Sequence, residues 1–469
     1  MKTTSLLALT FGGLLTATAA LAQTPSGPAG TWQGSLKLPS GDLQTVFTLA
    51  GTPAALSGTL SVPQQGLKDM NITRVQLRAD SLYLTLTPLE ARFIGRFSPD
   101  QQQVSGLWQQ GGAEMPLTLT HGAAPAKAAL RRPQTPQAPF PYQSQDVSFT
   151  NAKAKLNLAG TLTLPKGKGR FPAVVLVSGS GPQDRNESIL GHQPFLVLAD
   201  YLTRQGFAVL RYDDRGTAQS GGTFAGATTA DFTTDAQAAL AYLRTRPDIK
   251  PDQVALIGHS EGGLIAWQTA AQPGGPNLVV TLAGPGLAGD AVLLRQQQDI
   301  GRAQGMDTAS LGEMRRVNGA LFAELRRQPA STSTEALTKL LASRVQQLQP
   351  QVSAEEALKG VAPLTGPWMR YFLTTDVATY LQKVKVPVLA LNGAKDTQVA
   401  AAENLQAIEQ GLKAAHNRDV TFRILPGLNH LFQTANTGAP QEYVGLEETF
   451  APAALEAVGS WLKTHTSGK

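Results

Sequence analysis

Residues 254–267 read VALIGHSEGGLIAW, an apolar run followed by a G-x-S-x-G motif and a second apolar run. The two runs predict a strand that turns directly into a helix at Ser260. Gly258 and Gly262 fit such a tight turn, because a Cβ at either position would collide with the neighbouring strand and helix. The turn presents the serine hydroxyl, so Ser260 is a candidate nucleophile. A glycine-rich turn with a serine at the start of a helix is the alternative for the motif alone.

Apolar runs of the same kind recur beyond residue 143, separated by helical patterns. They cover residues 173–177, 207–210, 254–257, 278–280, 386–391 and 420–425. Strands buried on both faces of a parallel sheet show such continuous runs, because helices cover each side. Residues 146–149 and 156–162 alternate instead and predict an antiparallel hairpin at the sheet edge. An open α/β sheet of eight strands is expected.

A serine hydroxyl needs a base to take its proton and an acid to orient that base. Among the six histidines of the chain, His430 follows the last predicted strand, where a loop can bring its ring over the sheet edge. The other five histidines suit the role less well. His121 is expected in the linker, His192 at the start of a helix, His416 before the last strand and His465 in the tail. His259 adjoins the serine but is expected to point to another side of the turn. We therefore predict that His430 is the base.

The predicted acid is Asp396, which follows the strand at 386–391. Its carboxylate can accept a hydrogen bond from the imidazole Nδ1–H and stabilise the imidazolium. Asp376 is the alternative acid.

A tetrahedral oxyanion needs two backbone donors. Glu261 N–H, just after the serine, is one of them. The other is expected in the loop 178–182, SGSGP, where Ser180 N–H is the first choice and Gly181 the alternative. The loop lacks the Lys-Ser/Thr ending of a phosphate-binding loop.

Two charged segments accompany these motifs. Residues 212–216, YDDRG, predict a structural turn in which Arg215 pairs with a carboxylate. Residues 183–187, QDRNE, lie beside the oxyanion loop, where they either contact substrate or form a solvated charged loop. No set of His, Asp and Glu has the spacing of a metal site, and no cofactor is expected.

Length, charge and cysteine content exclude several classes of function. The chain has 469 residues, which favours two folded units, and a formal charge of +6 without a long basic run, so no nucleic-acid partner is expected. Cysteine is absent, which excludes disulfides and thiol catalysis. Residues 1–22 combine a charged tip, an apolar stretch and a small-x-small site, and predict a signal peptide for export to the periplasm or medium. No segment predicts stable membrane insertion.

The remaining chain divides into three parts. Residues 24–121 form short alternating segments about ten residues apart, which predict a small antiparallel β domain, a sandwich or barrel, with a binding or scaffolding role. Residues 122–142 are rich in Pro and Ala and predict a semi-rigid linker. Residues 143–469 hold the α/β sheet. An insertion at about 285–385 predicts a helical cap over the substrate crevice. The alternative is an inserted segment that only stabilises the fold.

Residues 145–465 resemble the α/β-hydrolase superfamily, whose nucleophile, acid and base also follow in this chain order. The combination of SGSGPQDR at 178–185, DDRG at 213–216, GHSEGG at 258–263 and PWMRYF at 367–372 resembles exported bacterial carboxylesterases with a β-rich N-terminal domain. The resemblance implies hydrolysis of short acyl esters through an acyl-enzyme, with triad roles on Ser260, Asp396 and His430. Ser178-Gly179 replaces the usual His-Gly of the oxyanion loop.

Three other functions stay open from sequence. A serine aminopeptidase would need acidic residues to grip a free amine, for which Glu187 and Glu261 are candidates. An acyltransferase would use a non-water acceptor. A binding protein would work through its β domain, although the presence of all three triad residues argues against it.

Overall fold

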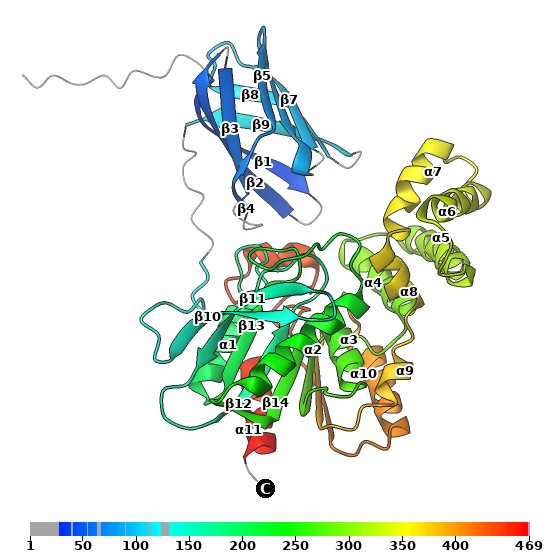
Figure 1. Cartoon of the computed structure of the whole chain (residues 1–469). Helices are drawn as coiled ribbons and strands as arrows, with labels where there is room; N and C mark the ends of the chain where they lie inside the picture. The colour runs from blue at the N-terminus through cyan, green and yellow to red at the C-terminus, as the bar shows by residue number, and fades with distance from the viewer. Residues whose placement is uncertain are drawn as a thin grey trace, which may run out of the picture. The chain divides into compact units, whose positions relative to one another are not determined.

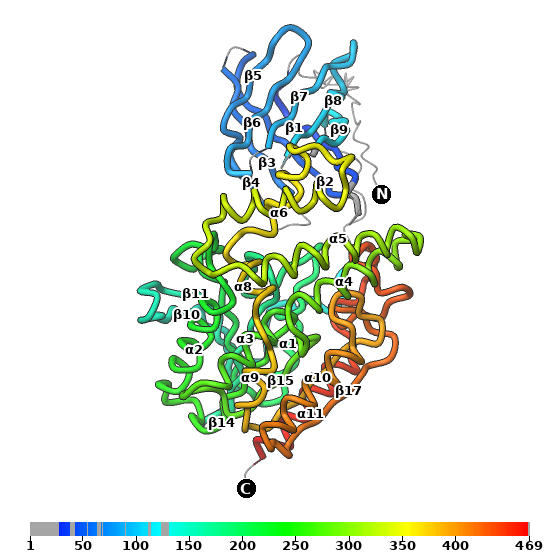
Figure 2. Tube along the Cα trace, turned by 90° about the vertical axis from the view of Figure 1, so that its right-hand side faces the viewer, coloured from blue at the N-terminus to red at the C-terminus, as the bar shows by residue number. Residues whose placement is uncertain are grey.

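The computed structural model describes residues 28–38, 41–53, 55–62, 67–89, 91–110, 113–122 and 131–467. The chain divides into two units, one made mostly of the N-terminal strands and one that contains residues 125–469 (Figures 1 and 2). The predicted signal peptide, residues 1–22, lies outside the described residues. Within the described ranges, no helix has both the length and the apolarity that a membrane span requires.

The N-terminal unit is one nine-stranded sheet with the order β4-β3-β2-β1-β9-β8-β7-β6-β5. Alternate residues of its strands point inward, so that Leu82, Leu84 and Phe93 are buried while their sequence neighbours are not. The predicted antiparallel β domain is confirmed. The strands are β1 (Gly30–Leu38), β2 (Gly41–Thr52), β3 (Ala55–Val62), β4 (Leu67–Asn71), β5 (Arg74–Arg78), β6 (Ser81–Leu86), β7 (Ala91–Phe97), β8 (Gln103–Gln110) and β9 (Ala113–His121).

His121 is the last residue of β9, so it belongs to the β domain and not to the linker. Its ring centroid lies 4.5 Å from that of Trp32, and its Nε2 lies 3.1 Å from the carbonyl oxygen of Ala29. The strand runs on because β9 pairs with β1, a neighbour from the other end of the domain.

Residues 131–142, in the second half of the predicted linker, hold no helix or strand and belong to the second unit of the chain. The Arg132 guanidinium donates to three carbonyl oxygens of residues distant in the chain, those of Leu190, Val444 and Leu446, at 2.7–3.1 Å. Gln134 donates to the carbonyl of Phe450 and accepts from two backbone amides there. This segment is therefore attached to the hydrolase part of the chain.

The second unit contains an eight-stranded sheet, as predicted, with the order β10-β11-β13-β12-β14-β15-β16-β17. The hairpin β10–β11 is antiparallel, and the strands from β12 to β17 are parallel to one another. The strands are β10 (Gln143–Asn151), β11 (Leu156–Leu164), β12 (Phe171–Val177), β13 (Ala208–Tyr212), β14 (Ile249–His259), β15 (Leu278–Leu282), β16 (Val388–Gly393) and β17 (Val420–Leu425).

Helices cover both faces of this sheet (Figure 1). In β12, Val175 and Val177 pack into a core with α2 (Thr229–Thr245), α3 (Glu261–Ala270) and α10 (Ala401–Ala414). Val174 and Leu176 pack on the opposite face with α1 (Pro194–Arg204) and α11 (Pro452–Thr466). Burial on both sides explains why the strand sequences show no polar alternation.

The insertion between β15 and β16 is helical, as predicted. Leu321, Phe322 and Leu341 belong to a separate apolar core within it. Its helices are α4 (Gly289–Ala303), α5 (Thr308–Arg327), α6 (Thr334–Leu348), α7 (Ala354–Val361), α8 (Pro367–Thr374) and α9 (Ala378–Leu381).

Candidate active site

Ser260 lies at the junction of β14 and α3 with φ 53° and ψ −118°. This positive φ is strained for a residue with a side chain and costs about 1–3 kcal/mol. The surrounding backbone holds it, since a Cβ on Gly258 would lie 1.9 Å from the Gly262 carbonyl oxygen, and one on Gly262 would lie 2.2 Å from the Val177 carbonyl oxygen. The two glycines thus allow the close approach of β12, β14 and α3 that the sequence motif predicts.

Asp396 and His430 form a buried pair. His430 Nδ1 lies 2.8 Å from Asp396 Oδ2, and the Asp396 side chain is 0% exposed. Asp396 Oδ1 accepts the backbone N–H groups of Gln398 and Val399, both at 2.8 Å. The carboxylate is therefore fixed by three hydrogen bonds, and it holds the ring with Nδ1 as donor and Nε2 free for a proton.

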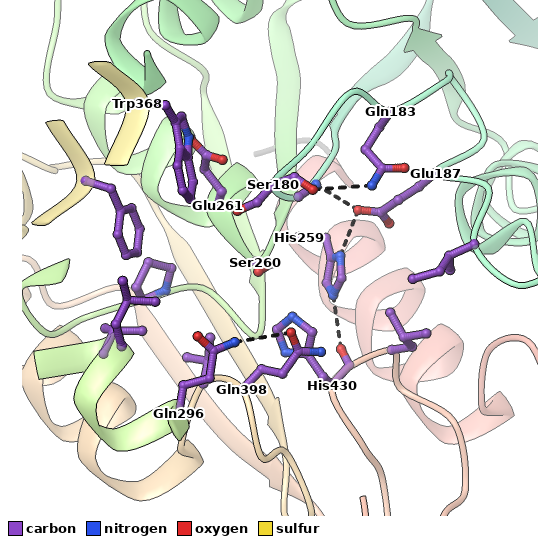
Figure 3. Close-up of a pocket in the computed structure, with 18 residues that line it drawn as sticks. Ser180, Gln183, Glu187, His259, Ser260, Glu261, Gln296, Trp368, Gln398 and His430 are labelled. Carbon is purple, nitrogen blue, oxygen red and sulfur yellow. Dashed lines mark hydrogen bonds and ion pairs between the residues drawn. The ribbon is translucent and has the colours of Figure 1, made fainter. Parts of the chain in front are cut away.

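Ser260 and His430 line one cavity of about 250 Å³, together with Ser180 (Figure 3). Residues of the cap close part of it, namely Pro285, Val292, Leu293, Gln296, Trp368 and Phe372. Asp376, the alternative acid, is exposed and accepts the N–H of Ala378 at the start of α9 instead. The structure thus brings Asp396, rather than Asp376, to His430.

The predicted oxyanion donors lie around the same cavity. Ser180 and Glu261 both line it, whereas Gly181 is not among the lining residues. Gly179 lies so close to the nucleophile that a Cβ on it would be 3.2 Å from Ser260 Cβ. Its N–H donates to Glu187 Oε1 at 2.8 Å and is therefore already engaged, and the amide that follows it in the chain is that of the predicted donor Ser180.

Comparison with known proteins gives the family. A family model described as "Serine aminopeptidase, S33" matches residues 192–434, just over half of the chain, including Ser260, Asp396 and His430. The chain belongs to this family. It is an α/β-hydrolase with an added N-terminal β domain.

Two curated proteins are similar in sequence. Esterase EstD of Thermotoga maritima is 27% identical over 311 residues, which cover 65% of this chain and 64% of the esterase. The putative hydrolase YtaP of Bacillus subtilis is 32% identical over 122 residues, 23% of this chain and 41% of that protein. The chain therefore spans less than two thirds of either relative. Among solved structures, an esterase of Pyrococcus furiosus aligns with 17% identity and a TM-score of 0.41, over 69% of this chain and 90% of its own.

An ion pair and several hydrogen bonds hold the predicted oxyanion loop in place. Arg185 Nη2 lies 2.6 Å from Asp213 Oδ2, and Asp214 accepts Ser178 Oγ–H and Gln183 N–H, each at 3.0 Å. Burial raises the pKa of Asp214 to about 8. The predicted turn at 212–216 is therefore structural, and it anchors the loop that carries Ser180.

Two further predictions for this region have clear outcomes. Arg215 pairs with Asp235, Nε to Oδ2 at 2.7 Å, so its predicted carboxylate partner is confirmed. Glu187 is only 4% exposed, so residues 183–187 are not simply a solvated charged loop.

Glu261 faces the cavity with a carboxylate that already has partners. Its Oε1 accepts Thr229 Oγ1–H at 2.6 Å and the Nε1–H of Trp368, in the cap, at 2.8 Å. Burial raises the pKa of this carboxyl despite these donors. The residue whose amide is a predicted oxyanion donor is thus tied to the cap.

His259 differs from its predicted orientation. Instead of pointing away from the site, its ring lines the cavity, with its centroid 4.9 Å from that of His430. Its Nδ1 lies 2.8 Å from Glu187 Oε1 (Figure 3). Burial disfavours the charged ring, but the Glu187 carboxylate outweighs burial and the pKa of His259 is raised. Sequence reasoning missed this pair, whose members are 72 residues apart.

The other histidines lie outside the cavity. His192 is buried, and burial lowers its pKa to about 4, so the ring is neutral. His465 lies in α11, 3.1 Å from Asp419, and His416 lies between α10 and β17. In the parts of the chain that the structure describes, no group of three or more His, Asp and Glu could hold a metal ion.

Proposed function

We propose that the chain is an exported serine carboxylesterase that hydrolyses short-chain acyl esters through an acyl-enzyme. The observation that carries this proposal is the strained Ser260 at one wall of a cavity that also holds the buried Asp396–His430 pair. Similarity to a protein named an esterase supports the ester class, and the sequence pattern of residues 1–22 supports export.

The reaction follows from these positions. Ser260 Oγ attacks the ester carbonyl carbon while its proton passes to His430 Nε2, and Asp396 stabilises the imidazolium that forms. Ser180 N–H and Glu261 N–H stabilise the oxyanion of the tetrahedral intermediate. The C–O bond then breaks and the alcohol leaves with the proton from His430. Water repeats the sequence on the acyl-enzyme and releases the acid.

Small acyl groups fit the size and lining of the site. A cavity of about 250 Å³ lies at the lower end of ligand sites. Its cap side is lined by Val292, Leu293, Trp368 and Phe372, which suit an apolar acyl or alcohol group.

A serine aminopeptidase is the second candidate, favoured by the family description and by the two carboxylates at the cavity. An aminopeptidase would use them to bind the substrate's free amine. Glu187 Oε1, however, accepts from Gly179 and His259, and Glu261 Oε1 accepts from Thr229 and Trp368. Because one oxygen of each carboxylate already serves two protein donors, the ester reaction is the better match.

One experiment separates these candidates. The purified protein is expected to react with a fluorophosphonate at Ser260, detected by mass spectrometry of the labelled peptide, and to hydrolyse p-nitrophenyl acetate and butyrate. Aminoacyl-anilides are expected to remain uncleaved. Cleavage of anilides alone would favour the aminopeptidase, and no labelling at Ser260 would refute both.

Substrate charge provides a further prediction. No Lys or Arg is among the residues that line the cavity, and a charge on His259 would be matched by Glu187. A substrate carboxylate would lose its hydration there without gaining a cation. We expect kcat/KM for p-nitrophenyl hemisuccinate to be at least about tenfold below that for the similarly sized valerate, a loss of about 1.4 kcal/mol. Equal values in paired steady-state assays would contradict the assigned cavity.

A further inference from the structure

The two ring nitrogens of His259 both face hydrogen-bond acceptors. Nε2 lies 3.0 Å from the backbone carbonyl oxygen of His430, and Nδ1 lies 2.8 Å from Glu187 Oε1. A carbonyl has no proton to donate, so Nε2 must carry one. Glu187 Oε1 also accepts the Gly179 N–H, as a carboxylate oxygen does. With Nδ1 unprotonated, two lone pairs would face each other, so both nitrogens carry protons.

Burial makes this ion pair stronger than a surface pair. The side chains of His259 and Glu187 are 8% and 5% exposed. A lone charge so far from water would be costly, whereas paired charges with their hydrogen bonds satisfied are tolerated. The other ionisable groups that act on the pair are His430, whose ring is 4.9 Å away, and the carboxyls of Asp396 and Asp214.

The pair connects three segments whose relative positions matter for the reaction. Through Gly179 N–H it holds the amide next to the predicted oxyanion donor Ser180. His259 immediately precedes Ser260 in the chain. Through the carbonyl of His430 it holds the loop that carries the base. Glu187 has φ 53°, a strained conformation of the kind that clusters at functional sites.

We propose that His259 is an imidazolium paired with Glu187 in the resting protein, and that this buried pair positions the oxyanion loop and His430 around Ser260. The positioning role rests on the proposed function, whereas the charge of His259 does not. Neither residue takes part in bond making, so both are positioning residues rather than catalytic ones.

The pair also sets an alkaline limit for activity. The pKa of His259 is raised, so the doubly protonated ring persists below that pKa and is lost as the pH rises through it. A ring with one proton can keep its bond to Glu187 or to the His430 carbonyl, but not both. The rate is expected to fall on the alkaline side for this reason.

His192 provides an internal reference for the charge. It is equally buried, and its Nε2 lies 2.9 Å from the carbonyl oxygen of Tyr443. Two groups that can donate also face this ring: Thr449 Oγ1 lies 2.9 Å from its Nδ1, and the side-chain amide nitrogen of Gln433 lies 3.1 Å from its Nε2. One proton therefore satisfies His192, while His259 requires two.

The charge can be measured by ¹⁵N NMR of the imidazole nitrogens in the full-length protein at pH 8. We expect imidazolium shifts on both nitrogens of His259 and the pattern of a neutral ring for His192. Signals are assigned from His259→Gln and His192→Gln, or by elimination with variants of His121, His416 and His465. A neutral His259 in the wild-type protein would overturn the proposal.

The positioning role is tested with Glu187→Gln, which keeps an oxygen for Gly179 but removes the negative charge. We expect kcat and the fluorophosphonate labelling rate to fall about 100-fold with little change in KM, because the donor and the base lose their alignment. The variant should also shift the alkaline limb to lower pH. His192→Gln, the matched control, should lower thermal stability but leave the pH profile unchanged.

The outcomes separate the two proposals. An unchanged kcat and alkaline limb in a folded Glu187→Gln protein would refute the positioning role. Absence of labelling in the wild-type protein would refute the proposed function, while the NMR measurement would still decide the charge of His259.

Discussion

Replacement of Ser260 by alanine is expected to lower kcat for p-nitrophenyl esters by about 10⁶-fold, because removal of the nucleophile leaves only binding and the oxyanion donors. Folding should be little affected, since alanine keeps the same backbone and the flanking glycines are unchanged. Steady-state kinetics and thermal unfolding measure the two effects. Labelling by the fluorophosphonate should disappear with the hydroxyl.

The matched control is Ser144→Ala, at an exposed position of β10, which should retain full activity and labelling. Undiminished turnover in purified Ser260→Ala, free of wild-type protein, would exclude Ser260 as the nucleophile.

Replacement of Asp396 by asparagine is expected to lower kcat by about 10⁴-fold. An asparagine can keep its oxygen on the two backbone amides that Asp396 Oδ1 accepts, those of Gln398 and Val399. Its amide nitrogen then faces His430 Nδ1 and forces the proton to Nε2. The ring becomes a donor toward Ser260 and can no longer accept the serine proton.

Asp376→Asn provides the control for this second prediction, because it changes the alternative acid in the same way at an exposed site. Its kcat should equal that of the wild type across the pH range. A large loss in Asp376→Asn, or a loss of less than tenfold in Asp396→Asn, would assign the acid role elsewhere.

Local sequence patterns predict much of this fold. The apolar runs of β12, β14 and β16 follow from burial on both sheet faces, and the position of Ser260 follows from the glycines that permit a tight turn. Asp396 and His430 could be predicted because each follows a strand, and the carboxyl ends of parallel strands meet at one edge. Their 2.8 Å contact is a consequence of that topology.

The contacts between distant segments could not be predicted in this way. Glu187 belongs to a charged loop whose sequence suits solvent equally well, and nothing near it in the chain indicates His259. Trp368 reaches Glu261 across 107 residues, because the cap folds back over the nucleophile turn. Such pairs depend on how loops of irregular conformation meet, for which the chain offers no periodicity.

The hydrogen bonds of Arg132 and Gln134 determine where the N-terminal β domain could be exchanged for another domain. They place the boundary between the two units before residue 131, although the first strand of the hydrolase sheet starts only at Gln143. A graft that exchanged the front module at residue 142 would strip the carbonyls of Leu190, Val444 and Leu446 of their guanidinium donor. A functional domain exchange would therefore have to keep residues 131–142 with the hydrolase domain.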